Sequence, residues 1–269
     1  AVSQKANSIK VTWEPLEGAA SYIVYYKKGN SRWKEAARNV KKTEYTHSKL
    51  ILGDQYTYTV KGVINGKETS YDRKGVSATV VPETVKLRKA TSGGYNKVNI
   101  SWNKAAGAAE YVIYIKKNGK WAKLATTKKT SYAHLNTKAF PVVTGKQYTY
   151  TVRAMGVNGK KAIYGSYSNT GITGRAMPAR TAISSLNSSK NALTVSYKKV
   201  AGASGYQIAY SLYKDKGYRY VTVSGSRLST TIRKLASKKN YFVKVRAYRT
   251  VNKKRCYGAY SPVKYKKTK

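Results

Sequence analysis

One tract occurs three times in this chain, and its regular spacing constrains the fold more than any other feature. Each copy has an aromatic residue, a Gly-Ala pair that begins five residues later, and a tyrosine nine residues later. The copies are Trp13…Gly18-Ala19…Tyr22, Trp102…Gly107-Ala108…Tyr111 and Tyr197…Gly202-Ala203…Tyr206. They lie 89 and 95 residues apart, which indicates one structural unit repeated in series. Features common to all copies are expected to be scaffold, so function is sought in what differs.

The sequence around each copy has the pattern of β-strands. Ile9 and Val11 alternate with Lys10 and Thr12 ahead of the first aromatic residue, and the other copies repeat this alternation. A period of two is typical of a strand with one buried and one solvated face. Further β-branched and aromatic runs follow at Tyr22–Tyr26, Tyr111–Ile115, Tyr206–Tyr210, Tyr56–Val60, Tyr148–Val152 and Tyr241–Val245. No segment has a helical pattern, so each unit is predicted to be an antiparallel β-sandwich.

Two further motifs recur. Leu50, Val142 and Leu235 each lie six residues before a tyrosine, namely Tyr56, Tyr148 and Tyr241. This spacing is typical of a tyrosine corner, in which the phenol bonds to upstream backbone. Asn65-Gly66 and Asn158-Gly159 supply residues that tolerate positive φ and predict tight hairpins.

Together, the aromatic residue before the Gly-Ala turn, the Tyr-led strand after it and the Leu…Gly…Tyr corner resemble fibronectin type III modules. The resemblance implies an all-β chain of three consecutive fibronectin type III-like sandwiches. The Lys-Lys pairs, the Asn-Gly-Lys hairpins and the closing run from Tyr164 to Ser168 look most like modules of Gram-positive bacterial secreted or cell-surface proteins.

We expect module boundaries near Pro82 and Pro178, where the loss of an amide donor between strands is tolerated. The modules are then residues 1–82, 83–176 and 177–269, the first with a short or truncated opening strand. The second carries a longer loop at Leu135–Phe140. The third has Tyr197 in place of tryptophan, and its Asn252-Lys253 hairpin lacks glycine.

Charge is the property that differs most between the repeats. The chain has 53 Lys and Arg against 10 Asp and Glu, a formal net charge of +43, which favours contact with polyanions. Residues 1–82 hold 14 basic and 7 acidic residues, residues 83–176 hold 17 and 2, and residues 177–269 hold 22 and 1. The net charge therefore rises from +7 through +15 to +21 while the scaffold stays the same.

The third module offers candidate residues for polyanion binding. Strand alternation places Tyr241, Val243, Val245 and Ala247 inward, and Lys244, Arg246 and Tyr248 outward. The hairpin tip adds Lys253, Lys254 and Arg255, and the closing strand adds Lys264 and Lys266. In fibronectin type III topology these strands are neighbours, which predicts one continuous patch for an anionic polysaccharide or wall polymer. Nucleic acid stays open as a partner, since phosphates bind such a surface without sequence reading. A Lys-rich solvated surface without a ligand is the alternative.

Catalytic and metal sites are not expected. His47 and His134 occupy equivalent positions in different modules without an acidic or thiol cluster, which indicates structural roles. Paired carboxylates occur in the first module only, where Glu14 and Glu17 flank a turn. Cys256 is expected to be a half-buried strand residue, and as the single cysteine it allows no intramolecular disulfide. No cofactor and no enzyme activity are predicted.

The expected function is that of a non-catalytic spacer and adhesion segment whose C-terminal half contacts anionic polymer. Two alternatives remain: a pure stalk or accessory array of a larger enzyme, and a nucleic-acid-binding protein. No run of about 18 apolar residues predicts a membrane span. Ala1–Lys5 does not have the character of a signal peptide, so we expect a mature chain or a fragment of a larger exported protein, located outside the cell or on its surface. The sequence does not determine the oligomeric state.

Overall fold

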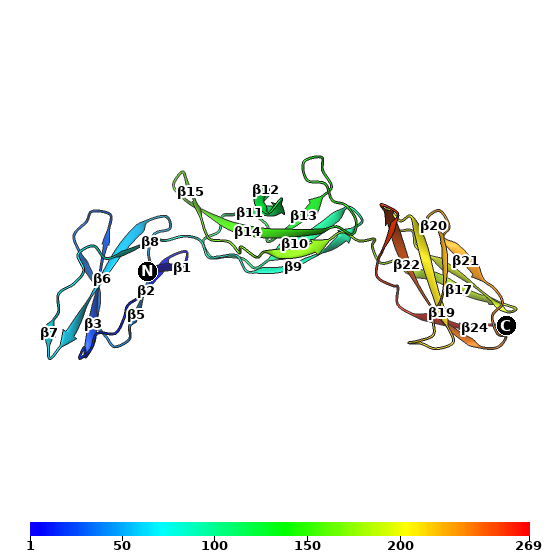
Figure 1. Cartoon of the computed structure of the whole chain (residues 1–269), viewed down its shortest axis with the longest axis horizontal. Helices are drawn as coiled ribbons and strands as arrows, with labels where there is room; N and C mark the ends of the chain where they lie inside the picture. Colours follow the sequence, from blue (N-terminus) through cyan, green and yellow to red (C-terminus); the bar gives the residue numbers. More distant parts are fainter. The chain divides into compact units, whose positions relative to one another are not determined.

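All regular structure in the chain is β. A computed structural model describes residues 1–269 and contains 24 strands and no helix (Figure 1). The strands form six sheets, three of three strands and three of five strands. Strands β1–β8, β9–β16 and β17–β24 repeat one strand order three times, so the fold is the predicted series of three antiparallel sandwiches.

The first repeat has the sheet orders β1-β2-β5 and β4-β3-β6-β7, with β8 also paired to β6. Its strands are β1 (Val2–Lys5), β2 (Ser8–Thr12), β3 (Ser21–Lys28), β4 (Lys34–Val40), β5 (Glu44–His47), β6 (Gln55–Ile64), β7 (Lys67–Glu68) and β8 (Val76–Thr79). The opening strand β1 has four residues, whereas its counterparts in the later repeats have eight and seven.

The second repeat has the orders β9-β10-β13 and β12-β11-β14-β15, with β16 paired to β14. Its strands are β9 (Leu87–Gly94), β10 (Lys97–Trp102), β11 (Glu110–Lys117), β12 (Lys120–Thr127), β13 (Ser131–Leu135), β14 (Gln147–Asn158), β15 (Lys161–Tyr164) and β16 (Ile172–Arg175).

The third repeat has the orders β17-β18-β21 and β20-β19-β22-β23, with β24 paired to β22. Its strands are β17 (Ile183–Ser189), β18 (Ala192–Tyr197), β19 (Gly205–Ser211), β20 (Arg219–Ser224), β21 (Ser229–Ile232), β22 (Asn240–Val251), β23 (Lys254–Tyr257) and β24 (Lys264–Lys267).

The chain divides into two compact units. One consists of Ala1–Arg88, Trp102–Thr130 and Tyr150–Ile172, and the other of Lys89–Ser101, Ser131–Thr149 and Thr173–Lys269. The first repeat lies within the first unit and the third repeat within the second unit, so each of these repeats can be described on its own terms.

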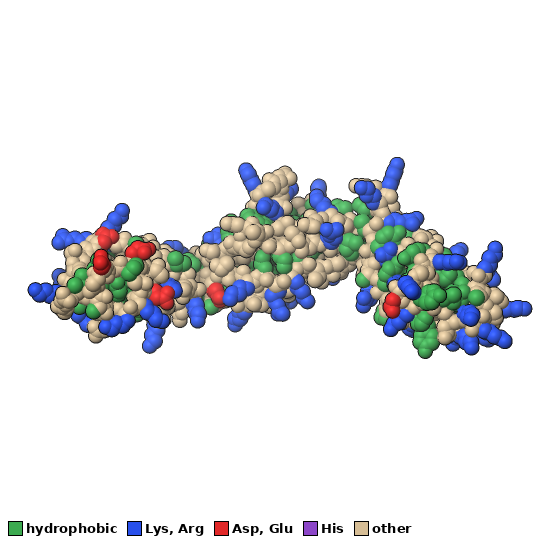
Figure 2. Space-filling model, turned by 60° about the horizontal axis from the view of Figure 1, so that its bottom comes forward, with side chains coloured by type: hydrophobic (Ala, Val, Ile, Leu, Met, Phe, Trp, Pro, Cys, Tyr) green, Lys and Arg blue, Asp and Glu red, His purple; other side chains and the backbone are tan.

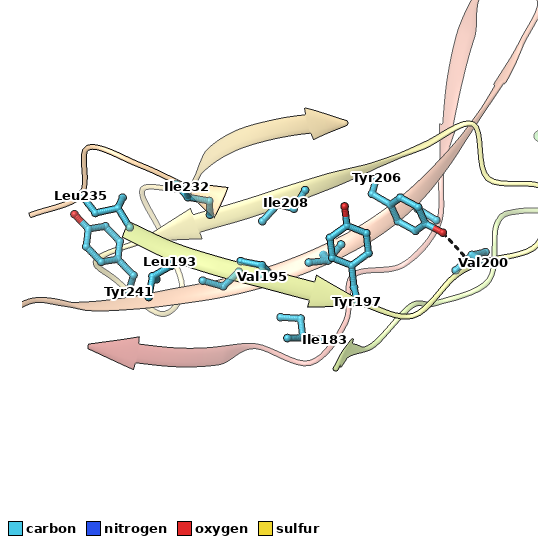
Figure 3. Close-up of a cluster of buried hydrophobic side chains, with 13 residues drawn as sticks. Ile183, Leu193, Val195, Tyr197, Val200, Tyr206, Ile208, Ile232, Leu235 and Tyr241 are labelled. Carbon is cyan, nitrogen blue, oxygen red and sulfur yellow. Dashed lines mark hydrogen bonds between the residues drawn. The ribbon is translucent and has the colours of Figure 1, made fainter. Parts of the chain in front are cut away.

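Each of these two repeats closes its sheets over a hydrophobic core. In the third repeat, Leu193 and Val195 from β18 and Ile208 from β19 are completely buried (Figure 3). The first repeat has Ile9, Val24 and Tyr58 at comparable depth. The alternation seen in the sequence selects these residues, because neighbouring side chains on a strand point to opposite faces.

The repeated tract has one local structure in all copies. Gly18, Gly107 and Gly202 have φ values of 75°, 73° and 69°, and the next amide closes a turn onto the carbonyl three residues back. A positive φ at the third position of such a turn requires glycine.

The repeated tyrosine completes this turn. The first turn amide donates to its hydroxyl oxygen in each copy: Leu16 to Tyr22 at 2.9 Å, Ala105 to Tyr111 at 3.1 Å and Val200 to Tyr206 at 2.8 Å (Figure 3 shows the last).

The hairpin predictions are only partly correct. Asn65 and Gly66 form the two-residue turn between β6 and β7, with φ values of 48° and 77°. In the second repeat, however, Asn158 belongs to β14 and pairs with Lys161, so the turn is Gly159-Lys160. Gly159 has φ 57° at the first turn position, where a type II′ turn requires glycine. Asn252 and Lys253 form the third turn at φ 47° and 63°, which places a lysine in the left-handed region.

Candidate polyanion-binding face

The outer face of the five-stranded sheet in the third repeat, turned away from the core, carries two of the candidate cations. Val243 and Val245 of β22 are fully buried, while Lys244 and Arg246, which alternate with them, are half-buried and point outward. The prediction for Tyr248 needs correction: it shares the outer face, yet it is only 7% exposed. Two residues of the neighbouring β23 cover its ring. The guanidinium carbon of Arg255 lies 4.9 Å from the Tyr248 ring centre, and the ring centre of Tyr257 lies 5.7 Å from it.

Cations and tyrosines alternate along this face. Lys244 Nζ lies 3.9 Å from the ring centre of Tyr218 and 4.9 Å from that of Tyr260. The guanidinium carbon of Arg246 lies 4.4 Å from the same Tyr260 ring and 3.9 Å from Tyr257. These distances are within the range of favourable cation–π contact. We call this series the cation–tyrosine ladder; its members are Tyr218, Lys244, Tyr260, Arg246, Tyr257, Tyr248 and Arg255.

Gln207 of β19 fixes the centre of the ladder. Its Oε1 accepts hydrogen bonds from Arg246 Nε and from the Tyr260 hydroxyl, both at 2.9 Å. Burial raises the pKa of Tyr260, and the charge of Arg246 opposes that shift. At the end of the ladder, a hydrogen bond with Tyr257 raises the pKa of Arg255, so this cation stays charged. The ladder is therefore a positively charged and aromatic surface.

Lys264 and Lys266 do not belong to this face, and the prediction of one continuous patch is wrong. In the β22–β24 pairing, Lys264 lies opposite Val243 and Lys266 opposite Tyr241. Directly paired residues of an antiparallel ladder point to the same side, which here is the side of the core. Both lysines are exposed because β24 lies at the margin of the sheet.

The cations of the hairpin tip between β22 and β23 also lie on different sides of the sheet. Arg255 pairs with Thr250 and shares the ladder side through Tyr248, whereas Lys254 pairs with Val251 on the other side. Lys253 is in the turn itself, and all three side chains are exposed.

The position of Arg246 has counterparts in the other repeats. Arg246 pairs with Gln207, Arg153 pairs with Val112, and Lys61 pairs with Ile23. Arg153 lies 4.9 Å from the ring of Tyr164 and 5.8 Å from that of Tyr167.

In the first repeat, Lys61 lies 5.4 Å from Tyr25 and 5.3 Å from Tyr71, but it also makes an ion pair of 2.9 Å with Glu68. In each repeat, the amide of the residue that follows Glu68, Tyr164 or Tyr257 donates a hydrogen bond to the same carbonyl position of the neighbouring strand. Glu68, Tyr164 and Tyr257 therefore occupy equivalent positions. The first repeat thus has a carboxylate where the other two have a tyrosine.

The distribution of acidic side chains over the three repeats agrees with this difference. All five ion pairs of the structure lie in the first repeat. Most of the acidic side chains visible in Figure 2 lie over that repeat, whereas lysines and arginines cover all three. In the third repeat, Lys244, Arg246 and Arg255 contact tyrosine rings and no carboxylate.

The other residues considered from the sequence have structural surroundings. His47 lies 4.5 Å from the ring of Tyr26, and its Nδ1 is 3.1 Å from the Tyr58 hydroxyl. His134 is 1% exposed, with Nε2 3.1 Å from the Phe140 carbonyl. Burial lowers the pKa of both histidines. No group of three or more His, Cys, Asp or Glu side chains is placed to hold a metal ion.

The corner tyrosines accept hydrogen bonds from backbone amides five residues upstream. The distances are 3.4 Å from Ile51 to Tyr56, 2.8 Å from Val143 to Tyr148 and 3.0 Å from Ala236 to Tyr241. Cys256 is a half-buried free cysteine in β23. The structure has no helix that is long and apolar enough to span a membrane.

Comparison with solved structures finds two chains built of fibronectin type III domains. The chain is similar to the FN1–FN3 domains of chicken CNTN1, with 20% identity over 99% of this chain and 95% of that chain, and a TM-score of 0.32. It is also similar to a segment of two fibronectin type III domains from chicken tenascin, with 18% identity, 70% and 99% coverage and a TM-score of 0.41. No family model matches the chain. At these values the three fibronectin type III-like sandwiches are assigned from the chain's own strand order, three times repeated.

Sequence reasoning did not find Tyr218, Tyr257, Tyr260 and Gln207 as parts of the site. The closing runs Tyr164-Gly165-Ser166-Tyr167 and Tyr257-Gly258-Ala259-Tyr260 carried the available signal, because they place two tyrosines three residues apart in the two basic repeats. The first repeat has Glu68 and Tyr71 at that spacing.

Proposed function

We propose that the chain is a non-catalytic spacer and adhesion array of an exported or cell-surface bacterial protein, with modules that meet near Pro82 and Pro178. In this proposal the third module binds an anionic polysaccharide or wall polymer through its outer face. The observation that carries it is the cation–tyrosine ladder, in which Lys244 and Arg246 contact tyrosine rings and no carboxylate.

The composition of the outer face favours an acidic glycan over nucleic acid. Besides the ladder, the outer face has Tyr220 opposite Ala209, and Tyr265 opposite Phe242, with Tyr220 and Tyr265 58% and 66% exposed. Aromatic side chains thus outnumber cations on this face. Nucleic-acid binding depends mainly on many phosphate contacts. An acidic sugar polymer presents apolar ring faces to the tyrosines and carboxylates to the cations.

The test is binding of the full chain to a soluble polyuronate, which has one carboxylate per sugar ring, at about 0.15 M salt. The site variant is Lys244→Gln/Arg246→Gln. The matched control is Lys264→Gln/Lys266→Gln, which removes the same charge from the other side of the sheet. Calorimetric titration measures Kd for each protein. We expect about a tenfold loss for the site variant, in line with two partly exposed charge contacts.

Three outcomes count against the proposal. Equal losses in the two double variants would reduce the effect to net charge alone. No binding by the unaltered chain would leave a pure stalk. Tighter binding of single-stranded poly(dT) than of the polyuronate would favour the nucleic-acid alternative.

A further inference from the structure

The third repeat contains a pocket that is separate from the outer face. The pocket has a volume of about 480 Å³ and lies between the loop that joins β19 to β20 and the turn that follows β21. This volume is within the range of small-molecule sites, about 300–1,000 Å³. Its principal lining residues are Arg219, Arg233, Lys234, Tyr210, Tyr213 and Tyr241.

The rim of the pocket is cationic. Arg219, Arg233 and Lys234 are exposed, and no acidic residue lines the pocket. Asp215, the single acidic residue of residues 177–269, acts elsewhere. Together with burial, it raises the pKa of Tyr218, which is on the ladder. Three cations without a carboxylate partner around one concavity favour an anionic ligand.

The floor and wall of the pocket are aromatic and held in place. Tyr241 is 8% exposed, and its hydroxyl accepts a hydrogen bond from the Ala236 amide. Tyr213, in the loop, is 59% exposed. Ser211 fixes that loop, because its hydroxyl donates to the Lys216 carbonyl at 2.6 Å and accepts from the Tyr213 amide at 3.0 Å. These bonds hold the backbone of Tyr213, and its exposed ring, which lies 5.5 Å from Lys216 Nζ, is available for stacking.

At the corresponding end of the first repeat, a histidine packs against tyrosine rings and a carboxylate pairs with a lysine. His47 packs there against Tyr26 and Tyr56, at 4.5 Å and 6.3 Å between ring centres. Lys28 makes an ion pair of 2.6 Å with Asp54.

The third repeat differs at both of these positions. Counted back from the corner tyrosine, Ile232 stands in place of the histidine and Lys239 in place of Asp54. In the second repeat, His134 at this position packs against Phe140 of the longer loop, at 6.5 Å between ring centres. The pocket therefore belongs to what distinguishes the third copy from the scaffold.

We propose that this pocket binds an anionic sugar unit: a single sugar ring that carries a carboxylate or a phosphate. The oxyanion is held by Arg219, Arg233 and Lys234, since guanidinium groups pair with both oxyanions through two parallel hydrogen bonds. The apolar face of the sugar ring lies on Tyr213. This site does not depend on the cation–tyrosine ladder or on the array function proposed above.

The test is a titration of the full chain, labelled with ¹⁵N, with glucuronate, glucose 6-phosphate, glucose, acetate and inorganic phosphate. Binding in the pocket shifts the backbone amide signals of Leu212, Gly217 and Leu235. The site variant is Arg233→Gln, and the matched control is Arg227→Gln, which removes the same charge from an exposed residue that does not line the pocket. We expect a roughly tenfold weaker Kd for the site variant and no change for the control, since only the site variant removes a charge-assisted hydrogen bond to the oxyanion.

Each result decides the proposal. Binding of glucuronate or glucose 6-phosphate with the expected variant pattern supports it, and the tighter of the two identifies the oxyanion. Equal binding of glucose, or equal losses in both variants, would overturn it. Acetate and phosphate as tight as the sugar anions would also overturn it, because the sugar ring then contributes nothing.

Two further variants keep the test decisive. If Arg233→Gln fails to fold, Tyr213→Ala replaces it; the expected result is that the preference for glucuronate over acetate disappears. Lys244→Gln/Arg246→Gln should bind the sugar anions normally. That result separates failure of this pocket from failure of the outer-face site.

Discussion

The first and third repeats have the same strand order and the same turn, but only the first repeat pairs its cations with carboxylates. In the first repeat, Arg38 makes ion pairs of 2.8 Å and 3.1 Å with Glu35 and Glu68, and Lys61 shares Glu68 at 2.9 Å. In the third repeat, Lys244 and Arg246 lie against tyrosine rings instead.

This difference concerns the surface potential more than stability. Exposed ion pairs contribute at most about 1 kcal/mol each, so the first repeat gains little stability from its carboxylates. The carboxylates do reduce its field, whereas the tyrosine rings that contact Lys244 and Arg246 do not neutralise these cations. Attraction of anions is therefore expected to be concentrated in the third repeat.

The largest expected effect comes from breaking the scaffold that both repeats share. Tyr206→Phe removes the acceptor of the buried Val200 amide, which should cost about 1–3 kcal/mol. A domain of this size loses roughly 4–8 °C of Tm per kcal/mol. Calorimetry of the full chain should show one lowered transition. Tyr22→Phe, at the equivalent contact of Leu16, should lower a different transition, and an unchanged profile in both variants would contradict the shared role.

The next effect sharpens the surface difference. Tyr257→Glu gives the third repeat the carboxylate that the first repeat has at Glu68, and we expect about a tenfold weaker affinity for a polyuronate. Tyr257→Phe keeps the ring against Arg246 and serves as the control, with unchanged affinity. Titration at two salt concentrations measures both. An equal loss in the two variants would mean that removal of the Tyr257 hydroxyl, and not the introduced carboxylate, weakens the binding.

The repeats should also differ in their response to mild acid. Burial lowers the pKa of His47 and His134 below the ordinary value of about 6.5, so the unfolded chain binds more protons in this range. The stability that these histidines contribute is complete above about pH 6.5 and is lost as the pH falls through their folded pKa values. Glu44 and Glu68 stay ionised in this window, because hydrogen bonds from Lys10 and Lys61 lower their pKa.

The measurement is calorimetry of the full chain between about pH 7 and pH 5. Transitions of the first two repeats should move down, while that of the third repeat, with Ile232 at the histidine position, should move less. An equal downward shift in all three would contradict the assignment to the histidines.

The smallest effect concerns a single turn. Lys253 has φ 63°, whereas Gly66 holds the equivalent position in the first repeat at φ 77°. Lys253→Gly should stabilise the third repeat by about 0.5–1 kcal/mol, because a side chain is disfavoured in the left-handed region. Lys254→Gln removes the same charge outside the turn and is the control. A gain of equal size in both variants would assign the effect to charge repulsion.

Much of the fold follows from local patterns. The alternation around Val195, the glycine at Gly202 and the Asn65-Gly66 hairpin each have the structure that their sequence predicts. The turn near Asn158 lies one residue later than predicted, because Gly159 adopts the positive φ of the first turn position more easily than asparagine does.

The candidate site was predicted less well. Lys244 and Arg246 lie on the outer face as alternation requires, but Tyr248 is covered by Arg255 and Tyr257 from another strand. Lys264 and Lys266 lie on the other side, since their side depends on the register between β22 and β24. Register is set by packing across strands, and the sequence of one strand does not contain it.

The residue pattern alone establishes the threefold repeat, its β character and the rise in net charge from +7 to +21. These properties depend on residue type and local spacing. Strand pairing and packing establish which cations share a face, which rings contact them and that a pocket is present in the third repeat. Gln207 of β19, Tyr218 before β20, Arg246 of β22 and Tyr260 between β23 and β24 come from separate parts of the chain. The pairing of these strands in one sheet brings them together. A period of two places a side chain relative to its own strand, but its neighbours depend on which strands pair and in what register.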